Sequence, residues 1–381
     1  MALNIALYAN LGRTLTPCSG VGRHCNEVGL VLAKREGVEV EFLTSHKNIN
    51  SRGQLPSNAP LGSLPLKPHK MSTSGSEKYR KLFGRPQFDS IIAPKTNWLY
   101  SPHDTRLISH RVPTAITIHD ARIFEPHLAP KSPKQVMENS IMKYWTQKAC
   151  EEAKLVFTVS DYSRKRLAKL LNLPLDKFIS IGNGYNSFSG MSLAQNSPNN
   201  SDLFSPPPRI VYTGGIRYLK GGDTLISFAK ALLAEQPEFI IDCIGGPDDP
   251  TLRKAAEALP NIQFHGFVGD ERYKYLLQRA LTLYFPSRYE GFGIPVIEAM
   301  SLGTPVIVSE KTSLPEIVGD AGLICSANDI ALAVSFVSQL SKSVDFYKNW
   351  QSKGYQHCEK FTWDKVADKI IQALKGTSES C

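Results

Sequence analysis

Short runs of apolar and β-branched residues alternate with amphipathic helical patterns along the chain. Typical runs are Ile5–Tyr8, Ala115–Ile118 and Leu281–Phe285. Strands that alternate with helices build parallel sheets from βαβ units, so the pattern predicts an α/β protein. The other predicted strands are Val38–Leu43, Ser90–Ala93, Leu155–Val159, Phe178–Ile181, Ile210–Tyr212, Phe239–Ile244, Ile262–His265 and Val306–Val308.

At 381 residues, with 42% hydrophobic and 21% charged residues, the chain has the size and composition of two globular domains. A stretch rich in Ser, Asn and Pro at 186–208 predicts a linker between an N-terminal domain, 1–185, and a C-terminal domain, 209–360. A second polar stretch, Lys47–Ser76, predicts a long mobile loop. Residues 361–381 carry apolar side chains at helical spacing and predict a closing helix. Thr362 is its candidate N-cap, and the apolar stripe consists of Trp363, Val366, Ile370 and Leu374.

Several classes of protein are disfavoured by composition. No apolar run approaches the roughly 20 residues of a membrane-spanning helix. The first residues lack the basic leader of a signal peptide and predict a strand. The seven cysteines form no CxxC pair, which favours reduced thiols in the cytoplasm and argues against a zinc site.

The positive charge is concentrated in the first half of the chain. Residues 1–190 contain 26 Lys and Arg against 14 Asp and Glu, whereas the second half has a slight acidic excess. The basic residues form two clusters, one of Lys67, Lys70, Lys78, Arg80, Lys81 and Arg85, the other of Arg164, Lys165, Arg166 and Lys169. A solvated surface explains both; the alternative is peripheral contact with an anionic membrane or a lipid-diphosphate acceptor. Few aromatic residues interleave these clusters, so nucleic acid is disfavoured as a partner.

Two glutamates, Glu290 and Glu298, flank a glycine-rich turn that follows a predicted strand and opens a predicted helix. Pro295 suits the first position of that helix. The unpaired N–H groups of the turn and the positive end of the helix dipole form an anion seat that a diphosphate would fit. Glu298, in the first turn, can then accept hydrogen bonds from a ribose diol, and Glu290 from a second polyhydroxylated group. The turn between them contains Gly291, Phe292, Gly293 and Ile294.

Glutamates at a helix start can also simply complement the dipole, but the surrounding residues are more specific. The stretch runs Pro286-Ser287-x-x-Glu290-Gly-Phe-Gly-x-Pro295-x-x-Glu298-Ala-Met-x-x-Gly303 and continues to Ser313-Leu314-Pro315-Glu316. It resembles the E-x7-E donor-binding motif of the retaining glycosyltransferases of family 4. The resemblance implies the GT-B fold, in which two Rossmann-like domains face each other across a cleft and the last helix crosses back to the N-terminal domain.

A second glycine turn, Gly214-Gly215, follows the strand Ile210–Tyr212 and leads to two cations, Arg217 and Lys220. Taken alone, they are better explained as exposed basic residues on a loop than as ligands of a diphosphate. The resemblance aligns Lys220 with the lysine that neutralises the leaving diphosphate. In the family an arginine commonly accompanies this lysine, five residues before it or immediately before it, and here those positions hold Gly215 and Leu219. Arg217, three residues before Lys220, either replaces that arginine or has no such role.

Two N-terminal elements also resemble the family. The loop Ser19-Gly20-Val21-Gly22 is similar to its GGxG loop, which brings backbone amides close to donor or acceptor. His119 directly follows the predicted strand Ala115–Ile118 in the element Thr-Ile-His-Asp, and the resemblance places it beside the transferred sugar. Asp120 has a simpler explanation as the cap of the next turn.

No Asp-x-Asp triplet occurs in the sequence, so a metal-diphosphate grip has no obvious ligands. Cationic side chains and a helix dipole can stabilise the leaving group instead. The prediction is a metal-independent glycosyltransferase without a cofactor. It would move a hexose from a nucleotide diphosphate sugar, GDP-mannose or a UDP-hexose, to a saccharide or lipid-linked acceptor in polysaccharide biosynthesis, in the cytoplasm or at the inner membrane face. The alternatives are a nucleotide-sugar 2-epimerase of the same fold and a catalytically silent sugar-nucleotide-binding protein.

Overall fold

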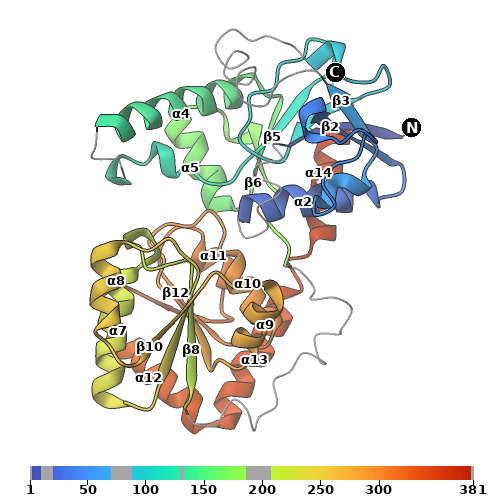
Figure 1. The fold of residues 1–381 in the computed structure, drawn as a ribbon. Coiled ribbons are helices and arrows are strands. Elements are labelled where there is room, and N and C mark those ends of the chain that lie inside the picture. Colours follow the sequence, from blue (N-terminus) through green and yellow to red (C-terminus); the bar gives the residue numbers. More distant parts are fainter. Residues whose placement is uncertain (1, 10–19, 70–87, 129–132, 186–206, 379–381) are drawn as a thin grey trace. The chain divides into compact units, whose positions relative to one another are not determined.

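The computed structural model describes residues 2–9, 20–69, 88–128, 133–185 and 207–378, and the chain divides into two compact units (Figure 1). Unit 1 contains Met1–Gly184 and Trp363–Cys381, and unit 2 contains Tyr185–Thr362. The chain therefore passes between the units twice. Most of the predicted linker, residues 186–206, lies outside the described residues.

Unit 1 is built on a seven-stranded parallel sheet of order β3-β2-β1-β4-β5-β6-β7. Its strands are β1 Leu3–Tyr8, β2 Val38–Ser45, β3 Leu66–His69, β4 Trp98–Ser101, β5 Thr114–Ile118, β6 Leu155–Thr158 and β7 Phe178–Ser180. Its helices are α2 Gly20–Ala33, α4 Pro133–Glu152, α5 Asp161–Leu171 and α14 Trp363–Ser378. β1 and β4 are paired at the centre, so the order reverses direction between them.

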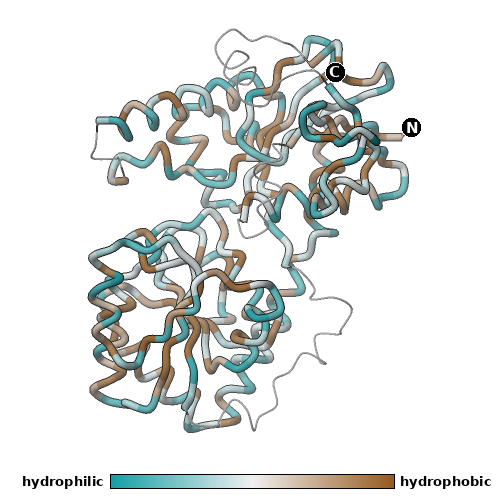
Figure 2. Tube along the Cα trace, viewed as in Figure 1, coloured by the Kyte–Doolittle hydropathy of each residue, from teal (hydrophilic) through white to brown (hydrophobic). Residues whose placement is uncertain are grey.

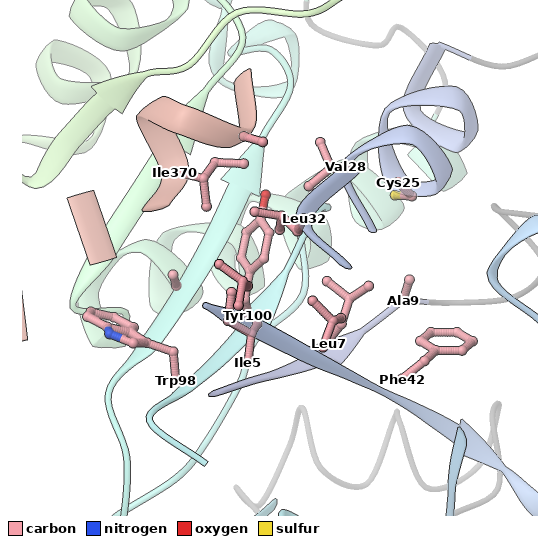
Figure 3. Packing of buried hydrophobic residues seen from close by; sticks show 14 of the residues in the cluster. Ile5, Leu7, Ala9, Cys25, Val28, Leu32, Phe42, Trp98, Tyr100 and Ile370 are labelled. Carbon is pink, nitrogen blue, oxygen red and sulfur yellow. The ribbon is translucent and has the colours of Figure 1, made fainter. Parts of the chain in front are cut away.

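The core of unit 1 lies on both faces of this sheet because successive side chains of a strand point to opposite faces. Ile5 and Leu7 of β1 pack with residues of α2 and α14, as Figure 3 shows for Val28, Leu32 and Ile370. Ala6 and Tyr8 pack in the other cluster, with residues of α4 and α5. The predicted stripe of the closing helix is buried. Full burial of a side chain such as Ile370 or Leu374 contributes about 1.5–3 kcal/mol.

The predicted strand Ser90–Ala93 is wrong. The segment begins as a 3-10 turn, Phe88–Ser90, and the next strand is β4, eight residues further on. The guanidinium of Arg111 donates to the carbonyl oxygens of Asp89 and Ile92, both at 3.0 Å, and of Ala93. These carbonyls are therefore bound by a side chain and not by a neighbouring strand.

The predicted loop Lys47–Ser76 is also corrected, as far as residue 69. Its first part packs under α2, with Leu61 1% and Leu64 7% exposed, and ends in the edge strand β3. Pro68 is tolerated within β3 because an edge strand pairs on one side only. The short edge strand β13 of unit 2 was likewise not predicted. The other predicted strands are confirmed to within a few residues at their ends.

Unit 2 is built on a six-stranded parallel sheet of order β10-β9-β8-β11-β12-β13. Its strands are β8 Arg209–Thr213, β9 Ile240–Ile244, β10 Ile262–Gly266, β11 Thr282–Phe285, β12 Val306–Ser309 and β13 Leu323–Cys325. Its helices are α7 Gly222–Glu235, α8 Pro250–Glu257, α9 Asp270–Gln278, α10 Ile294–Ser301, α11 Leu314–Val318, α12 Ile330–Lys342 and α13 Val344–Cys358. Figure 1 shows α7, α8 and α12 on one face of the sheet and α9 and α10 on the other.

Hydrophobic residues concentrate on the strands and on the inner sides of the helices in both units (Figure 2). In unit 2, all four residues of β11 and of β12 are buried. Strands buried on both faces carry continuous apolar runs, and this explains why the sequence predicted them well. The two units thus share one α/β architecture, with helices on both faces of a parallel sheet.

The structure describes the second of the two basic clusters. In the second cluster, Arg164 and Lys165 pair with Asp161 at 3.1 and 2.6 Å, and Arg166 pairs with the buried Glu125 at 2.6 Å. Two carboxylates therefore pair with three of its four cations. Most of the first cluster lies outside the described residues. Contact with a membrane surface stays a prediction.

Candidate active site

The order of the unit 2 sheet reverses between β8 and β11, with β9 and β10 on one side and β12 and β13 on the other. In parallel α/β sheets, ligands bind outside the carboxyl ends of the strands at such a switch point. The two glycine-rich turns predicted to bind the donor follow these two strands. The fold therefore brings Lys220 and Glu290 to one place.

The turn after β8 depends on glycines with left-handed backbone. Gly215 has a φ of 76°, and a Cβ on it would lie 2.7 Å from the carbonyl oxygen of Pro247. The hydroxyl of the buried Tyr212 lies 2.9 Å from the carbonyl oxygen of Gly215 and 3.2 Å from that of Lys220. Burial raises the pKa of the Tyr212 phenol, so the hydroxyl keeps its proton and donates. The strand thereby holds the loop that carries Lys220.

Arg288, in the turn after β11, joins the two loops. Its backbone N–H donates to the carbonyl oxygen of Leu219 at 2.9 Å, and its side chain donates to that of Tyr218 at 2.8 Å. The guanidinium also pairs with Asp223 and lies 4.1 Å from the centre of the Tyr218 ring. A planar guanidinium suits this combination of carboxylate, carbonyl and ring contacts.

Lys220 and Glu290 form an ion pair, with Nζ 2.5 Å from Oε1. The two side chains are 23% and 14% exposed, so both are shielded from solvent but reachable. Lys220 Nζ also lies 5.6 Å from the centre of the Phe285 ring. A cation held at this point can neutralise an anionic group at the carboxyl ends of β8 and β11.

The helix after Glu290 differs from the prediction in two details. α10 begins at Ile294 after the N-cap Gly293, whose φ is 105°, so Pro295 occupies the second helical position and not the first. Glu298 is consequently the fifth residue and opens the second turn, where it is 2% exposed. The left-handed backbone of Gly293 sets the earliest possible start of the helix, at Ile294. The positive end of the helix dipole still lies beside Glu290.

Arg217 is directed at its own loop. Its side chain donates to the carbonyl oxygen of Gly214 at 2.9 Å, and its Nε is buried without a hydrogen-bond partner among the described residues. Gly214, with a φ of 105°, lies against the aliphatic part of Lys220. A contact between Arg217 and a phosphate stays a prediction.

In unit 1, His119 follows β5 and lies with Nε2 3.0 Å from the carbonyl oxygen of Pro102. Because a carbonyl only accepts, Nε2 of His119 carries a proton. Asp120 accepts a hydrogen bond from the N–H of Arg122 at 2.8 Å, as expected of a turn cap. In the predicted glycine loop, Gly20, Val21 and Gly22 form the first turn of α2, and Ser19 lies outside the described residues. Residues 20–22 of the predicted loop are therefore helical, and an approach of their backbone amides to donor or acceptor stays a prediction.

Within the part of the chain that the structure describes, no group of three or more His, Cys, Asp or Glu side chains is arranged to hold a metal ion. In the same residues, no helix combines the length and apolar character that crossing a membrane requires.

Two family models match the chain in succession. The model described as Glycosyltransferase Family 4 matches residues 18–187, and the model described as Glycosyl transferases group 1 matches residues 194–357. The O-antigen chain mannosyltransferase B of Escherichia coli is 29% identical over 378 residues, which cover 94% of this chain and 96% of that protein. The chain is a family 4 glycosyltransferase.

Solved structures give this glycosyltransferase the GT-B fold. Sucrose-phosphate synthase from Thermosynechococcus elongatus matches with a TM-score of 0.72 at 17% identity, over 100% of both chains. HepE of Anabaena, solved in complex with UDP and glucose, matches with a TM-score of 0.67 at 15% identity, over 98% of this chain and 99% of that one. The prediction of a GT-B fold with two parallel-sheet domains is confirmed.

Three residues that support the site were not found from the sequence. Tyr212 and Arg288 hold the two loops of the glycosyltransferase, and His24 lies beside His119 with ring centres 4.7 Å apart. Tyr212 was predicted only as the last residue of a strand, and no motif pointed to Arg288. His24 is fully buried, and its Nδ1 lies 2.6 Å from Oδ1 of Asn183. Only the folded chain brings Asn183 to it.

His24 makes the stability of the glycosyltransferase depend on pH. Burial, and then the neighbouring His119, hold the pKa of His24 well below its ordinary value, although Asn183 acts in the opposite direction. Below pH of about 6.5 the unfolded chain takes up a proton at His24 that the folded chain does not accept. The free energy of unfolding therefore falls by up to about 1.4 kcal/mol per pH unit as pH decreases, and is unaffected by this group above that range.

The variant His24→Phe keeps a ring at this position and should lose this part of the pH dependence. Urea unfolding of the wild type and the variant between about pH 5 and 7.5 measures the difference. Parallel curves for the two proteins would contradict the assignment.

Proposed function

We propose that the glycosyltransferase is a hexosyltransferase of glycoconjugate biosynthesis, which moves a hexose from a nucleotide diphosphate sugar to a saccharide or lipid-linked acceptor with retention at the anomeric carbon. The observation that carries the proposal is the Lys220–Glu290 ion pair at the switch point of the unit 2 sheet. One loop supplies a cation for a diphosphate, and the other supplies a carboxylate for sugar hydroxyls. This combination suits a nucleotide sugar better than either part alone.

Each residue has a separate role in the proposal. Lys220 and the start of α10 neutralise the leaving diphosphate, and Arg217 is a second cation. The backbone that packs closely against the diphosphate is that of Gly214, Gly215 and residues 291–294. The buried Glu298 accepts from the ribose diol. Glu290 accepts from the donor sugar, and His119 helps to orient that sugar. Because Lys220 already neutralises charge at this point, the reaction needs no metal ion.

In the proposed reaction, the bond between the anomeric carbon and the phosphate oxygen breaks, and its electron pair leaves with the diphosphate. The acceptor hydroxyl forms the new bond on the same face of the sugar, and its proton passes to the departing phosphate oxygen. Charge on the sugar is oxocarbenium-like at the transition state. Lys220 contributes most there, because the negative charge that it faces grows as the bond breaks.

Lys220 cannot pair fully with the carboxylate of Glu290 and with a diphosphate at the same time. A diphosphate that binds Lys220 competes with Glu290 and releases its carboxylate for the sugar hydroxyls. Binding of the diphosphate and positioning of the sugar are thereby linked through one ion pair.

The relatives support a choice of donor to be tested first. The Escherichia coli relative is named as a mannosyltransferase of the O-antigen chain, which favours GDP-mannose. The Anabaena structure contains UDP and glucose, which keeps a UDP-hexose as the alternative. An O-antigen-type saccharide, free or carried on a lipid diphosphate, is the corresponding acceptor, with a place in the cytoplasm at the inner membrane face.

A panel of GDP-mannose, UDP-glucose and UDP-galactose tests the proposal. We expect one base to be selected, slow donor hydrolysis without acceptor, and the same rate in EDTA. Glu298→Ala should weaken binding of the nucleotide, whereas His119→Ala should lower turnover while the nucleoside diphosphate binds normally. Release of a free epimerised sugar nucleotide would identify the epimerase alternative. Binding of a donor without any hydrolysis or transfer would identify a silent binding protein. Loss of activity in EDTA with recovery in Mg²⁺ would contradict metal independence.

A further inference from the structure

Thr312 has a backbone conformation that its side chain disfavours. Its φ is 58°, and only Asn172 shares a positive φ among the non-glycine residues that the structure describes. Asn172 is the C-cap of α5, a position at which asparagine is common. A β-branched residue in the left-handed region is a genuine outlier and persists only where the surroundings determine it. Such residues cluster at functional sites.

The surroundings of Thr312 are the backbone of Glu290. Oγ1 of Thr312 accepts a hydrogen bond from the N–H of Glu290 at 3.0 Å. The hydroxyl of Ser313, which is fully buried, lies 3.0 Å from the carbonyl oxygen of Glu290 and 3.1 Å from that of Phe292. The connection between β12 and α11 therefore binds both backbone groups of Glu290.

This contact explains why the position holds threonine. Glycine would adopt the same φ without strain but has no hydroxyl to receive the Glu290 N–H. Valine would fill the same volume but leave that N–H without its acceptor. The left-handed backbone at residue 312 aims its hydroxyl at Glu290 and places Ser313 against the next carbonyls. The carboxylate of Glu290 is then carried on a backbone fixed at both its N–H and its C=O.

We infer that Thr312 is a positioning residue for the sugar-binding carboxylate of Glu290. The inference rests on the role proposed for Glu290. It assigns Thr312 an effect on the sugar part of the donor and not on the nucleotide, because the nucleotide is bound by Lys220, Glu298 and the start of α10. The strain at Thr312 is retained for the geometry of the site.

Three substitutions separate the contributions of Thr312. Thr312→Val keeps the shape and removes the hydroxyl, Thr312→Ser keeps the hydroxyl, and Thr312→Gly removes both the hydroxyl and the strain. The first measurement is an affinity ratio, the affinity for GDP-mannose divided by that for GDP, or the affinity for UDP-glucose divided by that for UDP. The others are kcat for donor hydrolysis and the midpoint of thermal unfolding. Asn172→Gly is the matched control, since it changes a left-handed residue far from Glu290 in the sequence and in the other unit.

We expect Thr312→Val and Thr312→Gly to lower kcat and the affinity ratio by about tenfold, while the nucleoside diphosphate alone binds within threefold of wild type. Thr312→Ser should restore both quantities, and Asn172→Gly should leave them unchanged. The thermal midpoint should fall less in Thr312→Gly than in Thr312→Val, because glycine relieves the strain.

Two results would overturn the inference. The first is a Thr312→Val variant with the affinity ratio and the kcat of wild type. The second is an equal loss of affinity for GDP and for GDP-mannose, which would indicate that Thr312 supports the whole donor-binding loop and not the sugar-binding carboxylate alone. Glu290→Ala distinguishes these from failure of the proposed function. If Glu290→Ala turned over donor like wild type, the role proposed for Glu290 would be wrong, and the inference about Thr312 with it. If Glu290→Ala were inactive and Thr312→Val were unaffected, only the inference about Thr312 would be rejected.

Discussion

We expect Lys220→Ala to lower kcat for sugar transfer by about 10²–10³-fold, because loss of one pre-aimed charge that faces a developing anion has this effect in comparable sites. The substitution also leaves Glu290 without the cation that it contacts. Affinity for the nucleoside diphosphate should fall as well, since the diphosphate loses a partner that it contacts before the reaction. Steady-state kinetics and isothermal titration with GDP and UDP measure the two effects.

The ion pair makes a second and less obvious prediction for the same site. Glu290→Gln should bind the nucleoside diphosphate more tightly than wild type, by about fivefold, because Lys220 is no longer engaged by a carboxylate worth about 1 kcal/mol. The same variant should transfer sugar poorly, because an amide replaces the carboxylate that accepts from the sugar. Tighter binding of the product with slower turnover would be the signature of a shared cation.

Controls for both variants are available in the same unit. Lys348→Ala removes an exposed lysine of α13. Glu310→Gln changes the net charge as Glu290→Gln does, but its carboxylate pairs with the exposed Lys311. Neither control should alter turnover or nucleotide affinity by more than about twofold. A loss of nucleoside diphosphate affinity in Glu290→Gln would reject the competition between Glu290 and the diphosphate.

The sequence was sufficient for the parts of the fold with strong local signals. Strands such as β11 and β12 are buried on both faces, so their composition is apolar throughout. The glycine turns after β8 and β11 were visible because only glycine adopts their left-handed backbone freely. Local patterns of this kind do not specify which strands are neighbours. The contact between Lys220 and Glu290 follows from the pairing of β8 with β11, which only the folded sheet establishes.

The errors in prediction have the same origin. Residues 90–93 look like a strand, but Arg111, from a later turn, binds carbonyls of that segment. No local pattern marks His24 as buried. Its ring is covered in part by Trp363 of α14, near the other end of the chain, with ring centres 5.9 Å apart. Pairings between residues far apart in the sequence leave no periodic signal. They determine which polar groups are buried and which carry the site.

The glycine between the two loops should be the most sensitive position of unit 2 to a single added methyl group. Gly221 has a φ of 73°, and a Cβ on it would lie 2.2 Å from the carbonyl oxygen of Pro286, which is backbone and cannot move aside cheaply. Gly221→Ala combines a left-handed alanine with this collision. We expect the free energy of unfolding to fall by about 2–5 kcal/mol.

Gly266 separates the two causes, because it has a φ of 63° and a Cβ on it would have nothing within 4 Å. Gly266→Ala should therefore show only the cost of the backbone, about 1–2 kcal/mol. Chemical denaturation gives the two losses of stability, and hydrogen exchange of the β8 and β11 amides assigns the difference to the contact between the loops. Since Gly221 directly follows Lys220 and Pro286 precedes Arg288 and Glu290, the collision should also separate the ion pair and lower turnover. Equal losses in the two variants would mean that the approach of the loops at Gly221 contributes nothing of its own.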